Sequence, residues 1–391
     1  MSTLFEDTKT AFALKSDAEL ERAYFLFKMI KSEPLVRIGT AVTNFALKAH
    51  LPVEQLIRAS VFDHFCGGVD EMDCLATIEK MYKYKVHSVL DYSVEGKEAE
   101  DQFDLAVQEI LQNINFAKEK ASIPFAVFKP SGFGRFKLFQ KMSEGAVLSE
   151  AELKDWNRVV ERFEIVCKTA YDKDVSLLID AEESWMQDAA DDLIESMMEK
   201  YNTKKAIVYN TLQMYRWDRL DYLKELHKRA LAKGFHIGLK MVRGAYMEKE
   251  RERAEEKGYK SPICKDKQTT DDNYNAGIEY MLKGENLSLY AGTHNELSTL
   301  KAMELAEIKG LKKDDKTIWF GQLYGMSDHI TYNLAKEGYN VSKYLPYGAV
   351  RDVMPYLIRR AEENTSVTGQ TSRELSLLKK ERNRRKKKGR L

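Results

Sequence analysis

The sequence predicts an α/β fold: a closed (β/α)8 barrel of the TIM type with an additional helical region before it. From residue 86 onward, eight short runs rich in apolar and β-branched residues alternate with long amphipathic segments. This alternation is typical of parallel strands joined by crossover helices, and eight such units are the number that closes a barrel. The 391 residues also leave room for a barrel of about 250 residues and further helices.

The first 85 residues are expected to be helical. Ser16 and Glu19 have the spacing of a capping box before apolar residues at helical intervals. A further helical stretch is expected at about 53–65. We therefore expect three parts, namely a helical region over 1–85, the barrel over 86–370 and a basic tail over 371–391.

The expected strands are 86–92, 125–128, 176–179, 206–209, 236–242, 287–290, 317–320 and 341–344. A doubly wound open sheet is the alternative, and it would favour a glycine-rich turn after the first strand. Gly132 and Gly134 instead follow the second strand, and Lys137 stands where a third glycine would be needed. The dinucleotide-binding fingerprint is therefore absent, which favours the barrel.

The distribution of charge and the cysteine spacing indicate which partners and metal sites to expect. Residues 379–391 hold nine basic residues and one acidic residue, so the chain's net charge of +1 leaves about −7 for the rest. We expect this tail to be a solvated, disordered end, with contact to anionic lipid or nucleic acid as the alternative. The four cysteines show no metal-ligand spacing, so reduced thiols and no metal site are expected.

No apolar run of about 18 residues is present, and the N-terminus lacks the basic start and apolar core of a secretory signal. It does not have the pattern of a transit peptide either. A cytoplasmic protein is expected.

Polar residues end seven of the eight expected strands. They are Lys129, Asp180, Gln213, Arg243, His294 with Asn295, Gln322 and Tyr344. The carboxyl ends of the strands of such a barrel converge at one mouth, where active sites lie. The strand ends therefore predict a site at this mouth, without indicating what binds there.

Several blocks of the sequence resemble the proline dehydrogenase family. They are FKPSG (128–132), LLIDAEES (177–184), MVRGAY (241–246), GTHN (292–295), FGQLYGM (320–326) and YLPYGAVRDVMPYLIRRAEEN (344–364). The likeness covers about residues 86–364. It implies FAD at the barrel mouth and oxidation of L-proline to Δ1-pyrroline-5-carboxylate, the first step of proline catabolism. Hydride would pass from C5 of proline to N5 of the flavin, and electrons would then pass to a quinone.

The resemblance also implies substrate-binding residues. Tyr356, Arg359, Arg360 and Glu363 have the spacing of one helix face. The planar fork of arginine suits a carboxylate, so Arg359 and Arg360 would bind the carboxylate of proline. A solvated Arg–Glu helix pair is the alternative. Tyr344 would pack on the proline ring, whereas the hydroxyproline-oxidising branch tends to carry a small residue there.

Three further residues are expected on the substrate side. The resemblance places Lys129 near flavin N5 and the substrate amine, and Asp180 in the ion-pair network of the pocket. Buried charges of this kind are costly unless they are paired, so a Lys–Asp or Asp–Arg pair is expected at the mouth. Leu323 would line the pocket. Each of these residues has a purely structural alternative.

The cofactor side is expected to include Lys240, Val242 and Gly244, with backbone N–H groups of the last two at the flavin edge. Some family members carry arginine where this chain has Lys240. How the Lys240 ammonium would lie relative to the flavin is therefore left open. Gln213 would bind the pyrimidine edge. The remaining expected cofactor residues are Lys267, Thr293, His294 and Asn295 around the flavin and its pyrophosphate, and Glu363 near the ribityl chain.

The expected partners follow from this chemistry. A separate pyrroline-5-carboxylate (glutamate semialdehyde) dehydrogenase would use the product, since the chain resembles a single-function form. The quinone makes transient contact of the basic tail with the inner face of the membrane plausible, and no nucleic acid is expected. Two other functions stay open: oxidation of hydroxyproline or another cyclic amine, and a non-catalytic protein that docks through its basic tail.

Overall fold

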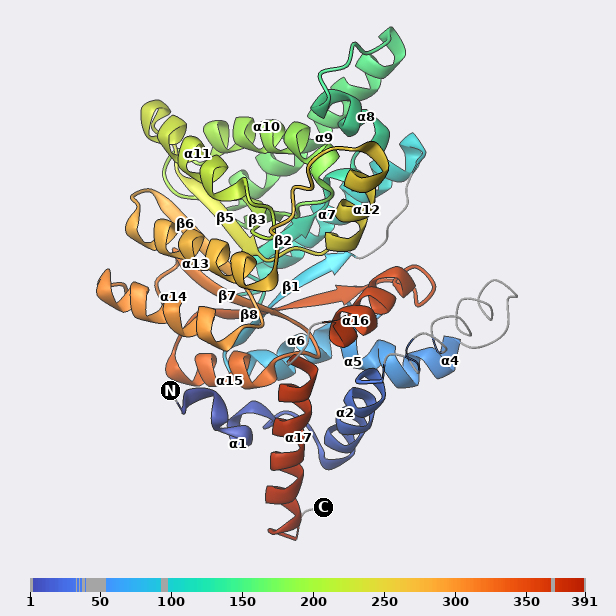
Figure 1. Ribbon diagram of the computed structural model, residues 1–391, viewed down its shortest axis with the longest axis vertical. Helices are drawn as coiled ribbons and strands as arrows, with labels where there is room; N and C mark the ends of the chain where they lie inside the picture. Colours follow the sequence, from blue (N-terminus) through green and yellow to red (C-terminus); the bar gives the residue numbers. More distant parts are fainter. Residues whose placement is uncertain are drawn as a thin grey trace. The chain divides into compact units, whose positions relative to one another are not determined.

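The computed structural model describes residues 3–32, 34, 36, 39, 54–92, 98–366 and 370–389. The strands β1 to β8 follow one another in chain order around a closed barrel, and every strand pair given by its register is parallel (Figure 1). The predicted fold class is confirmed. The chain divides into two compact units, a terminal unit made of Met1–Glu95 with Gln322–Leu391 and a central unit, Gly96–Gly321.

The strands are β1 Val86–Tyr92, β2 Phe125–Phe128, β3 Ser176–Ile179, β4 Val208–Gln213, β5 Ile237–Val242, β6 Leu287–Gly292, β7 Ile318–Leu323 and β8 Val341–Tyr347. The first three have the predicted bounds. β8 runs three residues further than predicted, so the expectation that Tyr344 ends it is wrong. Tyr344 lies inside the strand, opposite Val89 of β1, and the pairing continues to Tyr92 and Tyr347.

The helices of the central unit lie around β2 to β6 (Figure 1). They are α7 Glu100–Glu119, η3 Pro130–Gly132, α8 Phe136–Ser143, α9 Glu150–Lys173, α10 Ser184–Tyr201, α11 Arg219–Lys233, α12 Met247–Lys257, α13 Lys267–Lys283 and α14 Glu296–Ile308. Ser149 and Glu152 form a reciprocal capping box at the start of α9. The interior is aromatic, since the ring of Phe125 meets Tyr209, Tyr290 and Trp319 edge-on at 5.1–5.6 Å. These buried rings fill the barrel rather than leaving a pore.

The terminal unit contains the N-terminal helices and the last part of the chain. Its elements besides β1 and β8 are η1 Leu4–Glu6, α1 Thr8–Ala11, α2 Asp17–Ile30, α4 Glu54–Ile57, the π-helical turn η2 Arg58–Phe62, α5 Asp63–Phe65, α6 Leu75–Tyr82, α15 Asp328–Glu337, α16 Met354–Ser366 and α17 Gln370–Lys386. The predicted capping box of Ser16 and Glu19 is present at the start of α2. The three-part division expected from the sequence stays a prediction.

The C-terminal segment corrects one expectation. Instead of a disordered end, residues 370–386 form α17, which packs on α2 in the terminal unit (Figure 1). Leu377 and Leu378 are buried in a cluster with Leu20 and Phe27 of α2. Arg382 binds Glu21, and Arg385 binds Asp17 and the wholly buried Glu381. The expectation failed because it counted basic residues without the carboxylates that the fold brings to them.

Candidate functional site

The carboxyl ends of the central strands carry several of the predicted site residues. Lys129 directly follows β2, Asp180 directly follows β3, and Gln213 is the last residue of β4. Lys240 lies near the end of β5. Because neighbouring parallel strands end at the same face of a barrel, these residues share that face.

A buried ion pair lies between β3 and β5. Nζ of Lys240 donates to Oδ1 of Asp180, and both side chains are largely buried. A buried ammonium is costly in free energy unless a carboxylate accompanies it, so each group stabilises the charge of the other. The structure thus brings together a residue predicted on the substrate side and one predicted on the cofactor side.

A chain of hydrogen bonds connects four successive strand ends, and we call it the polar belt. Ser131, after β2, donates its N–H (2.8 Å) and its hydroxyl (2.5 Å) to the carboxylate of Glu182, after β3. Nε2 of Gln213, at the end of β4, donates to the carbonyl of Glu182 at 2.7 Å. Oε1 of Gln213 accepts from the N–H of Ala245, after β5, at 3.2 Å. The amide of Gln213 therefore fixes two loops, and its predicted contact with a flavin stays a prediction.

Arg243, which follows β5, continues this pattern to β6. Its Nη1 donates to Oγ1 of Thr293 at 2.8 Å, and its Nε donates to Asp271 at 2.7 Å. Its guanidinium also lies 4.5 Å from the ring centre of Tyr274. The sequence identified Arg243 as a polar strand end within the MVRGAY block, but did not name it among the cofactor-binding residues.

The turn after β5 requires glycine at position 244. Gly244 has a φ of +136°, and a Cβ there would lie 2.5 Å from the ring of Tyr215. Gly244 is exposed, so a cofactor can approach its backbone closely. The carbonyl of the half-buried Val242 is engaged, because it accepts from the N–H of Met214 at 2.8 Å.

The remaining predicted cofactor residues of the central unit lie at two helix starts. Oδ1 of Asn295 caps α14 by accepting from the N–H of Ser298 at 2.9 Å. Thr293 is buried, and His294 beside it is half-buried. Lys267 is exposed at the start of α13 and pairs with Asp271 at 2.5 Å. This set supplies backbone donors and cations, the groups that bind phosphate oxygens at helix N-termini.

The predicted residues of the terminal unit lie on β7, β8 and α16. Tyr344 is buried, and its carbonyl accepts from the N–H of Tyr324 at 2.8 Å. Leu323 ends β7 and packs, half-buried, against a cluster of apolar residues from the N-terminal helices and α16. Arg360 is buried with its guanidinium 5.2 Å from the ring centre of Tyr356, and Arg359 is half-buried. The side chain of Glu363 lies outside the described residues.

A buried chain of three charges supports β8 and the β7–α15 loop. Asp328, at the start of α15, lies between Lys15 (3.1 Å) and the fully buried Lys343 (2.9 Å). Lys343 precedes Tyr344 and also donates to the carbonyl of Met326. Burial would raise the pKa of Asp328, but the charges of Lys15 and Lys343 outweigh burial and hold that pKa below its usual range. The one feature of the sequence that indicated this group of three charges is Lys343, a lysine inside a mostly apolar strand.

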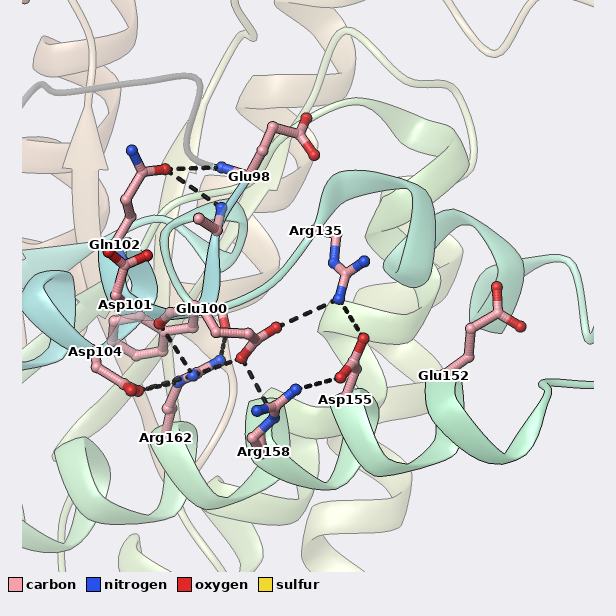
Figure 2. Close-up of polar contacts among 12 residues, drawn as sticks. Glu98, Glu100, Asp101, Gln102, Asp104, Arg135, Glu152, Asp155, Arg158 and Arg162 are labelled. Atoms are coloured by element: carbon pink, nitrogen blue, oxygen red, sulfur yellow. Dashed lines mark hydrogen bonds and ion pairs between the residues drawn. The ribbon is translucent and has the colours of Figure 1, made fainter.

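Arg162 of α9 contacts Glu100 and Asp104 of α7 (Figure 2), and it also fastens the loop that follows β2. Its guanidinium is buried and binds Asp104 (2.7 and 2.9 Å), Glu100 (2.8 Å) and the carbonyl of Phe133 (3.0 Å). Arg135 and Arg158 extend the network through Glu100 and Asp155 (Figure 2). Since Phe133 lies four residues after Lys129, this clamp restricts the loop that carries a predicted site residue.

Glu182 is a further residue that the sequence analysis did not single out. Burial raises the pKa of Glu182 to about 7, although the Ser131 hydrogen bonds and the charge of Lys129 act in the opposite direction. Its signal in the sequence was the run of acidic residues directly after the third strand, at positions 180, 182 and 183.

Comparison with known proteins identifies the family of this barrel. A family model described as "Proline dehydrogenase" matches residues 74–373. The chain belongs to the proline dehydrogenase family. It is an oxidoreductase of that family.

Two relatives and one solved structure illustrate the family likeness. The chain is 31% identical to "Proline dehydrogenase 2, mitochondrial" of Arabidopsis thaliana, covering 97% of this chain and 90% of the relative. It is 37% identical to "Carbapenem antibiotics biosynthesis protein CarD" of Pectobacterium carotovorum subsp. carotovorum, covering 89% and 91%. Proline utilization A from Bdellovibrio bacteriovorus is similar in fold, with a TM-score of 0.72 and 18% identity, over 96% of this chain and 41% of the solved one. The chain thus spans less than half of that longer protein.

Among the described residues, no helix has the length and apolar character needed to cross a membrane. In the same part of the chain, no cluster of three or more histidine, cysteine, aspartate or glutamate side chains has a geometry suited to a metal ion.

Proposed function

We propose that this protein is an FAD-dependent proline dehydrogenase that oxidises L-proline to Δ1-pyrroline-5-carboxylate, the first step of proline catabolism. The observation that carries the proposal is the burial of Arg360 on α16, in a chain of the proline dehydrogenase family. A guanidinium withdrawn from water binds a carboxylate more strongly than one on the surface, because the low dielectric strengthens the interaction.

In this proposal Arg359 and Arg360 bind the carboxylate of proline, and Tyr344 packs against its ring. Tyr344 is buried, and we expect the bulk of its side chain to leave little space for a ring hydroxyl, which would favour proline over hydroxyproline. Leu323 contributes an apolar contact. Together these contacts would orient the substrate for reaction, which is the main contribution of a binding site to such a transfer.

Lys129 and Asp180 are proposed to act on the polar side of the substrate. The amine of proline must be neutral before hydride leaves C5, because a cationic nitrogen has no lone pair to share with that carbon. When hydride leaves C5 and the N–H proton departs, the C5–N bond becomes the double bond of the product. Lys129 is proposed to lie beside the amine, and Asp180 to keep its neighbours in place through its pair with Lys240.

The residues of the central unit fit a flavin dinucleotide. Gly244 offers an exposed backbone without a side chain, Lys240 offers a buried cation, and α13 and α14 begin beside Lys267 and Thr293. Gln213, Val242, His294, Asn295 and Glu363 are the remaining residues proposed to hold FAD. When bound, the flavin supplies the acceptor for the hydride, and a quinone is the proposed acceptor of the electrons afterwards.

Anaerobic addition of L-proline tests this function directly. The purified chain is expected to show the visible absorbance of an oxidised flavin, which should bleach on addition of L-proline and much less on addition of hydroxyproline. A yellow protein that responds only to hydroxyproline would support the alternative substrate. A colourless protein, or one whose absorbance ignores both compounds, would contradict the proposal.

The proposed partners are a quinone and a separate pyrroline-5-carboxylate dehydrogenase, with the protein in the cytoplasm and transiently on the inner membrane face. Membrane contact is proposed to involve the exposed Lys386, Lys387 and Lys388 at the end of α17, since Arg382 and Arg385 already bind carboxylates. Each such lysine near an anionic surface contributes about 1 kcal/mol. No role with nucleic acid is proposed.

Exchanging Lys386, Lys387 and Lys388 for glutamine should reduce sedimentation of the chain with phosphatidylserine-containing vesicles by more than tenfold at low salt. The physical reason is loss of charge attraction without loss of the α17 ion pairs. Exchanging Lys224, Lys228 and Lys233 of α11 for glutamine removes the same charge elsewhere and serves as the control. Equal sedimentation of the two variants would remove the proposed role of the tail.

A further inference from the structure

Glu182, in the loop after β3, is bonded to three elements of the central unit: the η3 turn, helix α10 and the end of β4. Its carboxylate accepts from the N–H (2.8 Å) and hydroxyl (2.5 Å) of Ser131. Its backbone N–H donates to Oε1 of Gln187 at 2.8 Å, and its carbonyl accepts from Nε2 of Gln213 at 2.7 Å. Since its side chain and both of its backbone polar groups are bonded and the residue is buried, Glu182 has little freedom to move.

The element that Glu182 holds is the short turn that directly follows Lys129. This turn, η3, begins directly after Lys129, and the N–H of Gly132 closes it on the Lys129 carbonyl at 2.9 Å. The end of this turn is fixed independently, because the ring of Phe133 stacks on Phe128 at 4.3 Å and Arg162 binds the Phe133 carbonyl at 3.0 Å. Ser131 lies between Lys129 and Phe133, and its N–H and hydroxyl are both bonded to the carboxylate of Glu182.

Holding such a turn with a buried carboxylate costs free energy of desolvation. Burial raises the pKa of Glu182 to about 7, and the neighbouring carboxylate of Glu183 acts in the same direction. The charge of Lys129 acts against it, while Lys240 is engaged by Asp180 and Lys249 by Glu183. A neutral side chain of the same shape would avoid the desolvation cost, so stability alone does not account for a carboxylate here.

We propose that Glu182 is a positioning residue for Lys129: its carboxylate fixes Ser131 in the turn that begins directly after Lys129, so that the lysine is held for the substrate. This inference rests on the proposed function. Glu182 acts through the turn and is not itself placed against substrate or cofactor.

The test compares Glu182→Gln with the wild-type chain across pH. At pH 8, kcat/KM for L-proline should fall about 10- to 100-fold, the size expected when a reacting group is misplaced by about 1 Å. The deficit should shrink below pH 6, where the wild-type carboxyl is itself protonated. Ser131→Ala removes one of the two hydrogen bonds and should cost about fivefold. Glu199→Gln, on an exposed pair with Lys233 of α11, is the matched control and should change nothing.

Two readouts are independent of turnover. Backbone amide exchange of residues 129–133 should be faster in Glu182→Gln than in the wild type, with no change in the rest of the central unit. The folded-state pKa of about 7 lies above the ordinary 4.5. Wild-type stability should therefore fall, relative to Glu182→Gln, as pH rises from about 5 to 8. At pH 8 the variant is thus expected to be at least as resistant to denaturation as the wild type, although less active.

Full activity of Glu182→Gln at pH 8, unchanged amide exchange of its 129–133 segment, or lower stability than the wild type at pH 8 would each overturn the proposal. A purely structural glutamate would lose activity and stability together. If the wild-type chain does not oxidise proline, the proposed function fails, and amide exchange and stability still decide whether Glu182 holds the Lys129 turn.

Discussion

Replacing Arg360 by methionine is expected to lower kcat/KM for L-proline by about 100-fold or more. Arg360 is buried on α16 with its guanidinium over the ring of Tyr356. Removing one partner of a buried, charge-assisted hydrogen-bonded pair costs about 2–5 kcal/mol. Methionine keeps the apolar stem that packs on the ring, so the loss should appear in catalysis and mostly as a higher KM. Steady-state kinetics with L-proline measure the effect.

Two companion variants separate charge from geometry. Arg360→Lys keeps the charge but loses the planar fork, so it should recover only part of the activity. Arg373→Met in the same unit removes an arginine that binds Glu6 and is about one third exposed, and it should leave kcat/KM within about twofold. If Arg360→Met retained normal kinetics, the proposal that Arg360 on α16 binds the substrate carboxylate would be contradicted.

Replacing Asp328 by asparagine is expected to lower the free energy of unfolding by about 3–5 kcal/mol, the usual cost of breaking a buried ion pair by removing one partner. Asp328 lies between Lys15 and the fully buried Lys343, so its loss leaves two cations without their shared carboxylate. Chemical denaturation followed by circular dichroism measures the effect. Asp221→Asn, at a strongly exposed i,i+3 pair with Lys224, is the control and should stay within about 0.5 kcal/mol.

The pH dependence of this effect has a definite sign. Lys15 and Lys343 hold the folded-state pKa of Asp328 below its usual range, against the effect of burial. A lowered carboxyl pKa stabilises the fold above the unfolded-state value of about 4, and this stabilisation is lost as pH falls toward the folded-state value. The difference between wild type and Asp328→Asn should therefore be constant from pH 5 to 8 and shrink only in stronger acid. A difference that vanishes at pH 6 would contradict this account.

The alternation of apolar runs and amphipathic segments was sufficient to predict the barrel and the bounds of its first three strands. It was insufficient at the end of β8, where Pro346 follows Tyr344 and Leu345. Proline has no N–H and is typical of a strand end. In β8 the carbonyl of Pro346 instead accepts from Gly67 at 2.8 Å, and the strand continues to Tyr347. Partners distant in the sequence decided that boundary.

The candidate site was predictable to a similar degree. Helical spacing correctly placed Arg360 and Tyr356 on one face of one helix. No local pattern indicated that Asp180 would pair with Lys240, because their contact depends on how β3 and β5 lie in the barrel. The same holds for Glu182, since one glutamate in an acidic run becomes distinctive only when burial and Ser131 single it out.

The packing of α17 on α2 has a consequence for biosynthesis. Leu20 and Phe27 emerge from the ribosome early, whereas Leu377 and Leu378, which bury them, are added more than 300 residues later. A nascent chain must therefore carry an unshielded apolar helix face while the central unit is translated, and such surfaces favour aggregation. Chaperone capture of the growing chain, followed by release once α17 is made, is the behaviour we expect of this protein during translation.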